Sequence, residues 1–270
     1  MTQYQYKIST AIGDAQPDIF SESSTQLFPL GTRYEYGENT YRYAKAGAAI
    51  QAGLIVQAAA ITEGDIAVQS AVTAGDKTIS LTTTATTTDN QYDEGYLFIT
   101  QNNAQAARVG GVHRIKSHTS GSAGTLTFTL YEAIKVALDT SSKVTIIANR
   151  YNGVITAAAA PTAELVGVTY PLQDVDNTIT SGYYFWVQTH GLASVVCDDV
   201  SGLDTIGQPA FLNLGSTAGN VNAINAGSSS SVGTTITDTI VNDNFLIGYV
   251  VDVSGGDDAD AVILRLAGFD

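Results

Sequence analysis

The residues that could carry acid–base or metal chemistry are few in this chain of 270 residues. Of its three histidines, His113 and His118 lie five positions apart. On one strand an odd spacing puts two side chains on opposite faces, so this pair is not expected to share a metal ion. His190 stands between Thr189 and Gly191, which is typical of a turn between strands. We interpret all three histidines as surface or turn residues rather than as catalysts.

The other reactive side chains do not form a known motif. Cys197 is the only cysteine, which excludes an internal disulfide, and its apolar neighbours predict a small buried side chain. The acidic clusters at 174–176 and 257–260 lack the spacing of a calcium loop. A Ser-His-Asp triad stays open, because only geometry defines it. We therefore expect a structural protein, with no enzymatic activity, no cofactor and no metal site.

The composition favours a protein that packs against other proteins. Charged residues make up 14% of the chain, where about 25% is usual. The net charge is −14, from 26 acidic and 12 basic residues. No run of basic residues is present, which disfavours nucleic acid as a partner. The first seven residues lack the apolar core of a signal peptide, and the longest apolar stretch, 46–61, is interrupted and too short to span a bilayer. We expect no membrane partner.

Alternation of apolar and polar residues predicts an all-β fold. We expect a barrel-like body from residues 31–67 and 148–270, with an inserted β subdomain at 68–147. Within the insertion, residues 114–117 and 125–130 predict a hairpin.

The last third of the chain contains two further strand predictions. Residues 182–188 are apolar without alternation, which predicts a strand that is buried on both faces. Residues 245–251 and 261–266 predict a closing hairpin around an acidic loop.

A first hairpin is expected at residues 33–43, where two alternating runs flank a turn at 37–40. Aromatic residues on one face and opposite charges on the other support a single register. The expected pairs of facing residues are Tyr36 with Tyr41, Tyr34 with Tyr43, and Glu35 with Arg42.

Residues 1–30 predict an extended N-terminal arm, because they contain two prolines and a polar cluster but no sustained period. A disordered terminus is the alternative. Spaced apolar side chains in this arm predict anchors for docking on another protein. These candidate contacts are Ile12, Ile19, Phe20 and Phe28.

Three stretches of the chain resemble virion proteins of tailed bacteriophages. Residues 30–33, 41–47 and 52–54 resemble the opening of small β-barrel head-decoration proteins, in which a YxKAG pattern follows a hairpin. Segments 92–97, 114–118 and 151–154 are similar to phage structural proteins, and segments 247–250 and 262–266 resemble the closing hairpin of such barrels. The insertion at 68–147 departs from the minimal decoration barrel.

The resemblance implies a capsid decoration protein, or cement protein, with a β-barrel or tulip-like body. It implies a homotrimer that binds the major capsid protein on the outer surface of the virion, after synthesis in the host cytoplasm. The candidate contacts of the arm would then touch the capsid. One alternative is another virion component, such as a tail, neck or shell subunit; a shell subunit is disfavoured because the sequence predicts no long helix. The other is a carbohydrate-binding adhesive β module, which needs exposed aromatic residues.

Overall fold

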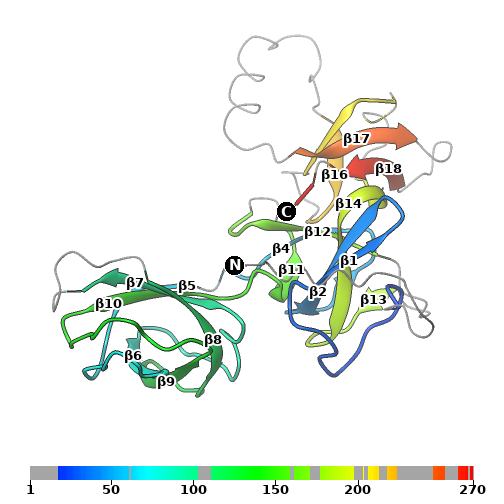
Figure 1. The fold of residues 1–270 in the computed structure, drawn as a ribbon. Coiled ribbons are helices and arrows are strands. Elements are labelled where there is room, and N and C mark those ends of the chain that lie inside the picture. Colours follow the sequence, from blue (N-terminus) through cyan, green and yellow to red (C-terminus); the bar gives the residue numbers. More distant parts are fainter. Residues whose placement is uncertain are drawn as a thin grey trace, which may run out of the picture. The chain divides into compact units, whose positions relative to one another are not determined.

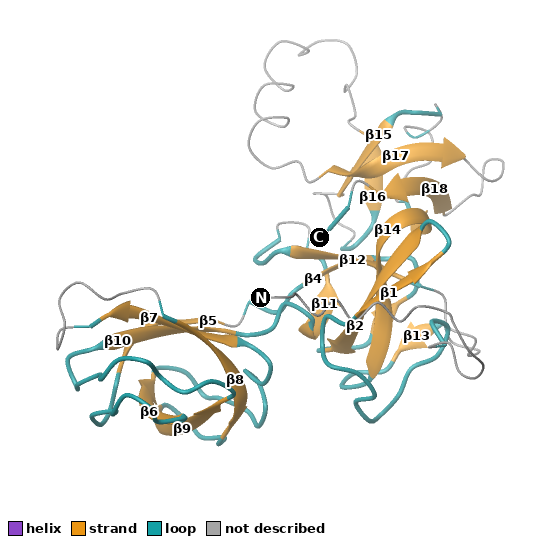
Figure 2. Cartoon of the chain, viewed as in Figure 1, coloured by secondary structure: helices purple, strands orange, loops and turns teal. Residues whose placement is uncertain are grey.

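The structure is a computed structural model that describes residues 18–60, 62–102, 111–158, 161–170, 177–197, 203, 206–212, 218–223, 246–252, 261–266 and 268–269. Within these ranges every regular element is a strand, and none is a helix (Figure 2). It follows that the described part of the chain contains no helix suited to crossing a membrane. The expected all-β class is confirmed.

The chain divides into two compact units, which we describe separately. The first unit is formed by residues 1–58 and 153–270, and the second by residues 59–152. The second unit, cyan to green in Figure 1, is therefore inserted into the sequence of the first. Its bounds are wider than the expected 68–147, because β5 (Thr62–Ala67) pairs with β10 (Lys143–Ile147) of the second unit and not with the barrel.

The first unit contains a closed barrel, which confirms the expected barrel body. Five strands of the described ranges form it, and the barrel is closed because the last strand pairs with the first. In order they are β2 (Asn39–Ala46), β11 (Asn152–Thr156), β4 (Ile55–Gln57), β12 (Leu165–Thr169) and β14 (Tyr184–Val196). Strand β1 (Arg33–Tyr36) adds to β2, while β3 (Ile50–Gln51) and β13 (Thr178–Ile179) form a separate short pair.

Strand β14 belongs to the barrel and also to an extension of the same sheet. Its first half pairs with β2, and its second half, from Gly191 to Val196, pairs with β18 (Ala261–Leu266). The extension continues through β17 (Leu246–Asp252), β15 (Pro209–Leu212) and β16 (Val221–Ala223). Strands β17 and β18 form the expected closing hairpin. The strand that was expected to be buried on both faces is confirmed, since Phe185, Trp186 and Val187 are all buried.

The second unit is a single curved sheet around an aliphatic core. Its strand order is β5, β10, β7 (Tyr96–Gln101), β8 (Val112–His118), β9 (Gly124–Leu130) and β6 (Thr78–Thr83). Strands β8 and β9 form the hairpin that the sequence predicts. The two edges approach each other, because Val68, just after β5, forms an antiparallel bridge with Leu81 of β6. One face of every strand can therefore point into a shared core, whose residues include Leu97, Ile115 and Phe128.

The first hairpin is formed by β1 and β2, but the expected register is wrong by two residues. The observed pairs are Arg33 with Arg42, Tyr34 with Tyr41, Glu35 with Thr40, and Tyr36 with Asn39. The turn consists of Gly37 and Glu38 alone, and Gly37 has a φ of 62°, as the first position of a type II′ turn requires. Glu35 forms its ion pair with Arg33 of its own strand, at 2.8 Å, instead of with Arg42.

Candidate functional site

The apolar side chains expected to anchor the chain on another protein contact the chain itself, as far as the structure describes them. Ile19 is buried, the ring of Phe20 lies 5.1 Å from that of Tyr170, and the ring of Phe28 lies 5.5 Å from that of Trp186. Ile12 lies outside the described residues. As capsid contacts these four residues stay a prediction, but only Phe20, at 37% exposure, is both described and substantially exposed.

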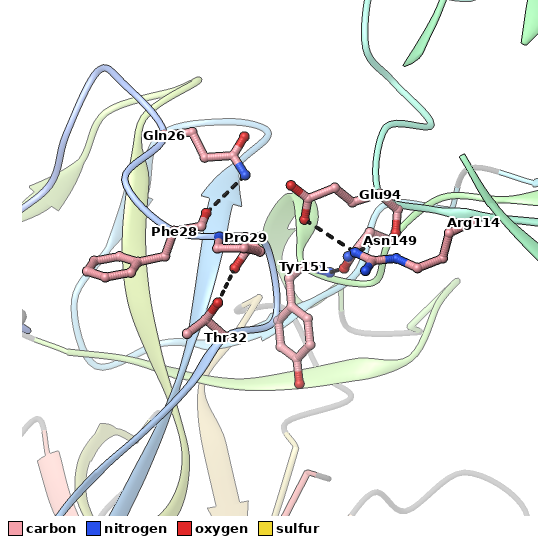
Figure 3. A network of polar contacts seen from close by, with 8 residues as sticks. All are labelled: Gln26, Phe28, Pro29, Thr32, Glu94, Arg114, Asn149 and Tyr151. Carbon is pink, nitrogen blue, oxygen red and sulfur yellow. Dashed lines mark hydrogen bonds and ion pairs between the residues drawn. The ribbon is translucent and has the colours of Figure 1, made fainter. Parts of the chain in front are cut away.

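Hydrogen bonds fix the same segment to the first unit. The backbones of Ser23 and Tyr184 exchange two hydrogen bonds of 2.9 and 2.8 Å, and the Leu27 amide donates to the Tyr43 hydroxyl at 3.1 Å. A turn follows, in which the Thr32 hydroxyl donates to the Pro29 carbonyl at 2.6 Å (Figure 3). Residues 18–32 are therefore part of the packed first unit rather than an arm that reaches away from it.

The expected opposite orientation of His113 and His118 is wrong. Both lie on β8 and both are buried. The pairing of β8 with β9 shifts between Ile115 and Ser117, so one extra residue on β8 forms a bulge there. The bulge reverses the alternation, and His118 returns to the same side as His113. His190 is exposed, as expected of a surface residue, but it lies inside β14 beside a second bulge and not in a turn between strands.

The hydrogen bonds of His118 indicate a structural role. Its Nε2 accepts from the Tyr92 amide at 2.9 Å, so its Nδ1 is the protonated nitrogen and donates to the Thr119 carbonyl at 3.0 Å. Among the described residues the Nδ1 of His113 has no hydrogen-bond partner, and burial lowers the pKa of this imidazole from its ordinary value. No group of three or more His, Cys, Asp or Glu side chains that could hold a metal ion occurs in the described ranges. Cys197 is buried, as expected, and the acidic clusters at 174–176 and 257–260 lie outside those ranges.

A buried carboxylate that the sequence did not single out stabilises the second unit. Glu63 is 4% exposed. Its side chain accepts hydrogen bonds from the Thr84 amide, the Thr84 hydroxyl and the Ala85 amide, at 3.2, 2.8 and 2.8 Å. Burial and, to a smaller degree, the charge of Glu63 raise the pKa of Tyr92 to about 12. Because three donors satisfy it, this carboxylate fixes the turn after β6 and is no catalytic candidate.

The outer face of β10, β7 and β8 carries the most distinctive group of exposed side chains in the second unit. Tyr96 lies between Ile147 and Arg114 across the three strands, and in the next row Phe98 lies between Thr145 and Val112. The rings of Tyr96 and Phe98 are 6.4 Å apart. We call these six residues the aromatic face. Tyr96, Val112 and Ile147 are exposed, although each is a large apolar or aromatic side chain.

The other half of the same sheet presents hydroxyl groups outward. Strands β6 and β9 pair Thr78 with Thr129, Ser80 with Thr127, and Thr82 with Thr125. The alternate residues of both strands, such as Ile79 and Phe128, point into the core. We call these six outward residues the hydroxyl face. Strands β6 and β9 therefore present hydroxyl groups at outward positions where β7, β8 and β10 present aromatic and β-branched side chains.

Arg114 places a positive charge within the aromatic face. Its guanidinium lies 5.4 Å from the ring centre of Tyr131 and 3.9 Å from the Glu94 carboxylate. Figure 3 shows Arg114 directed toward Glu94, whose carbonyl accepts a hydrogen bond from the Asn149 side chain at 3.3 Å. The ion pair with Glu94 is long, and 43% of the Arg114 side chain is exposed. A second carboxylate already contacts this residue, because Glu132 accepts a hydrogen bond from the Arg114 amide at 3.1 Å.

The two units differ sharply in charge. The second unit contains 8 acidic and 7 basic residues, for a net charge of −1, and the first contains 18 acidic and 5 basic residues, for a net charge of −13. Nearly all of the net charge of −14 therefore belongs to the first unit.

Comparison with family models, with curated proteins and with solved structures gives no match to this chain.

Proposed function

We propose that this chain is a structural virion protein that binds the outer surface of a tailed-phage capsid and stabilises the shell. Its partners are the major capsid protein and further copies of the chain, which associate most simply as a closed three-fold ring. The proposal rests on the resemblance of three sequence stretches to virion proteins of tailed phages and on the surface of the second unit.

The aromatic face is the observation that carries the proposal. A decoration protein acts by occupying many equivalent sites, so it needs exposed surfaces for protein–protein contact. Tyrosine, phenylalanine and arginine are enriched at the centres of such contacts. Contiguous apolar patches on the surface of a soluble domain are also uncommon unless they bind something.

A carbohydrate-binding adhesive module is the second candidate function. The observation in its favour is the exposure of Tyr36, Tyr96 and Tyr249, which are 56%, 41% and 46% accessible. Exposed aromatic rings offer stacking surfaces for sugars as well as for proteins. Tyr36 and Tyr249 belong to different strands of the first unit, and Tyr96 belongs to the second unit. No two of the three lie on the same strand, whereas the aromatic face is contiguous across three strands.

Sedimentation with undecorated shells tests the proposed function. Purified full-length chain is mixed with expanded shells of the virus that encodes it, and the bound protein is measured after centrifugation. We expect saturable binding with a fixed number of copies per shell, and shells that resist disruption at a higher temperature than undecorated ones. Binding to a panel of glycans without binding to shells would contradict the proposal and support the adhesive module.

A further inference from the structure

We propose that residues 18–28 form a strap that opens as a unit and docks on a second copy of the chain, at the same site of the first unit that it occupies within its own chain. This inference rests on the proposed function for the presence of neighbouring copies. It adds the contact through which those copies associate.

The strap contacts a site whose residues lie far from most of it in the sequence. The ring of Phe20 lies 5.1 Å from that of Tyr170. At the other end of the strap, the ring of Phe28 lies 5.3 Å from that of Tyr43 and 5.5 Å from that of Trp186. Tyr43 and Trp186 face each other across β2 and β14, and both are buried. The strap site consists of five residues that contact the strap through rings or hydrogen bonds, which are Tyr43, Tyr170, Thr180, Tyr184 and Trp186.

Hydrogen bonds add polar recognition to these ring contacts. The Glu22 carboxylate accepts from the Thr180 amide at 2.6 Å and from the Thr180 hydroxyl at 2.5 Å. The Tyr43 hydroxyl accepts from the Leu27 amide at 3.1 Å. Hydrogen bonds to an ionised carboxylate are about twice as strong as those between neutral groups. The strap site therefore selects an extended segment that has a carboxylate between two aromatic side chains.

The strap is only lightly buried and belongs to no strand of the barrel. Of residues 18–28, only Ile19 is buried. The strap joins the sheet through an isolated antiparallel bridge between Ser23 and Tyr184, and the five barrel strands close without it. Segments with few buried apolar contacts open locally at a lower free energy than the core that they cover. The strap can therefore leave its site while the barrel stays folded.

A turn at residues 29–32 is the hinge of the strap. The Thr32 amide and hydroxyl both donate to the Pro29 carbonyl, at 3.1 and 2.6 Å (Figure 3). Within the turn, the Gly31 amide donates to the Tyr43 carbonyl at 2.8 Å, which fixes the chain to β2. Large movements of a segment need changes of backbone angles at only a few such residues. Opening of the strap therefore leaves β1 and β2 in place.

A second copy is the partner whose fit the structure shows. Every copy has the same strap and the same strap site, so a strap that docks on a neighbour makes the contacts that it makes within its own chain. The closed and exchanged forms then differ in the hinge and in the entropy of association, and exchange of an identical element is a low-cost route to an oligomer. A strap that passes from each copy to the next closes the three-fold ring of the proposed function.

Disulfide formation between two different full-length variants tests the exchange. Ser23 and Tyr184 exchange two backbone hydrogen bonds, and the Cα atoms of such a pair are about 5.5 Å apart, which suits a disulfide. One variant carries Ser23→Cys and the other carries Tyr184→Cys with a different affinity tag, both with Cys197→Ala, so neither chain can form this disulfide within itself. The control replaces Ser23→Cys by Ser24→Cys. The pairs are mixed at rising concentration and oxidised, and circular dichroism verifies that each variant is folded.

We expect the Ser23→Cys and Tyr184→Cys pair to give at least tenfold more covalent product of the two different chains than the control pair. Adding Glu22→Gln to the Ser23→Cys chain weakens the closed strap, so the product should form about tenfold faster, the change expected when one charge-assisted hydrogen bond is lost. Absence of the product, equal yields from both pairs, or an unchanged rate with Glu22→Gln would overturn the inference.

Hydrogen exchange of the unaltered chain provides a second measurement that needs no substitution. The Ser23 and Leu27 amides should exchange through an opening that leaves the barrel amides protected, and exchange of both sets only together would also overturn the inference. These experiments contain no shells, so their outcome is separate from that of sedimentation. A chain that binds shells without exchanging straps keeps the proposed function and loses the inference; a chain that exchanges straps but binds no shell loses the proposed function alone.

Discussion

The two units have the same secondary structure but different surfaces and cores. The first unit contains a cluster of Tyr34, Tyr43 and Trp186, with ring centres 5.1–5.7 Å apart for the two pairs that include Trp186, in addition to a mainly aliphatic core cluster. The second unit encloses mainly aliphatic side chains. Almost all of the net negative charge lies on the first unit, and the contiguous aromatic face lies on the second. Two units of one secondary-structure class therefore differ in the charge and in the kind of side chain that they expose.

Matched core substitutions test whether the two units are separate cooperative structures. Phe185 of the first unit and Phe128 of the second are both fully buried. We expect Phe185→Ala and Phe128→Ala each to lower the free energy of unfolding of its own unit by about 3–5 kcal/mol, through lost burial and a cavity. The only tryptophan, Trp186, belongs to the first unit, so its fluorescence follows that unit while circular dichroism follows both. Equal shifts of one shared transition in both variants would contradict two independent units.

The bulge beside His190 provides a smaller test, within the first unit. Gly191 has a φ of 94°, and a Cβ there would lie 2.1 Å from the Asn39 side-chain oxygen, which accepts a hydrogen bond from the Leu192 amide at 2.9 Å. We expect Gly191→Ala to destabilise the first unit by about 1–3 kcal/mol. The control is Gly37→Ala, because Gly37 also has a positive φ but nothing within 4 Å of the added Cβ. Chemical denaturation should show the larger loss for Gly191→Ala; equal losses would mean that strain alone, without the clash, sets the effect.

The smallest expected effect is a pH dependence that distinguishes the second unit. Burial lowers the pKa of His113, the charge of Glu132 acts against this, and that of Lys135 adds to it. The unfolded state therefore binds a proton more readily than the folded state, and stability rises with pH. The contribution of His113 is complete above its ordinary pKa of 6.5 and is lost as the pH falls below that value. Thermal unfolding between pH 8 and 5.5 should show this loss for the second unit. His113→Leu should reduce the slope, and an unchanged slope would assign it to other groups.

The sequence predicted the all-β fold class and most of the strands, because the alternation of apolar and polar residues is a local property of the chain. It failed at one bulge and at one turn that is two residues shorter than expected. The bulge near Lys116 turned His118 inward, and the two-residue turn at Gly37 shifted the first hairpin. Neither is visible in apolar periodicity, although Gly at the first turn position was a signal for the shorter turn.

The aromatic face could be found only in part from sequence. In the run 96–99 every residue is apolar or aromatic, without the alternation of the neighbouring strands, which indicates that both sides of β7 are apolar. That Ile147 and Val112 lie beside this strand depends on pairing between segments far apart in the chain. The three donors to Glu63 come from the turn after β6, which no local pattern connects to β5.

A density map of decorated shells tests the proposed function most directly. The curved sheet of the second unit and the closed barrel of the first differ enough in strand arrangement for each to be placed in such a map. We expect density for both units on the outer surface of the shell, in contact with the major capsid protein and repeated at equivalent positions. Shells that carry no such density, although the chain is present in excess, would contradict the proposed function.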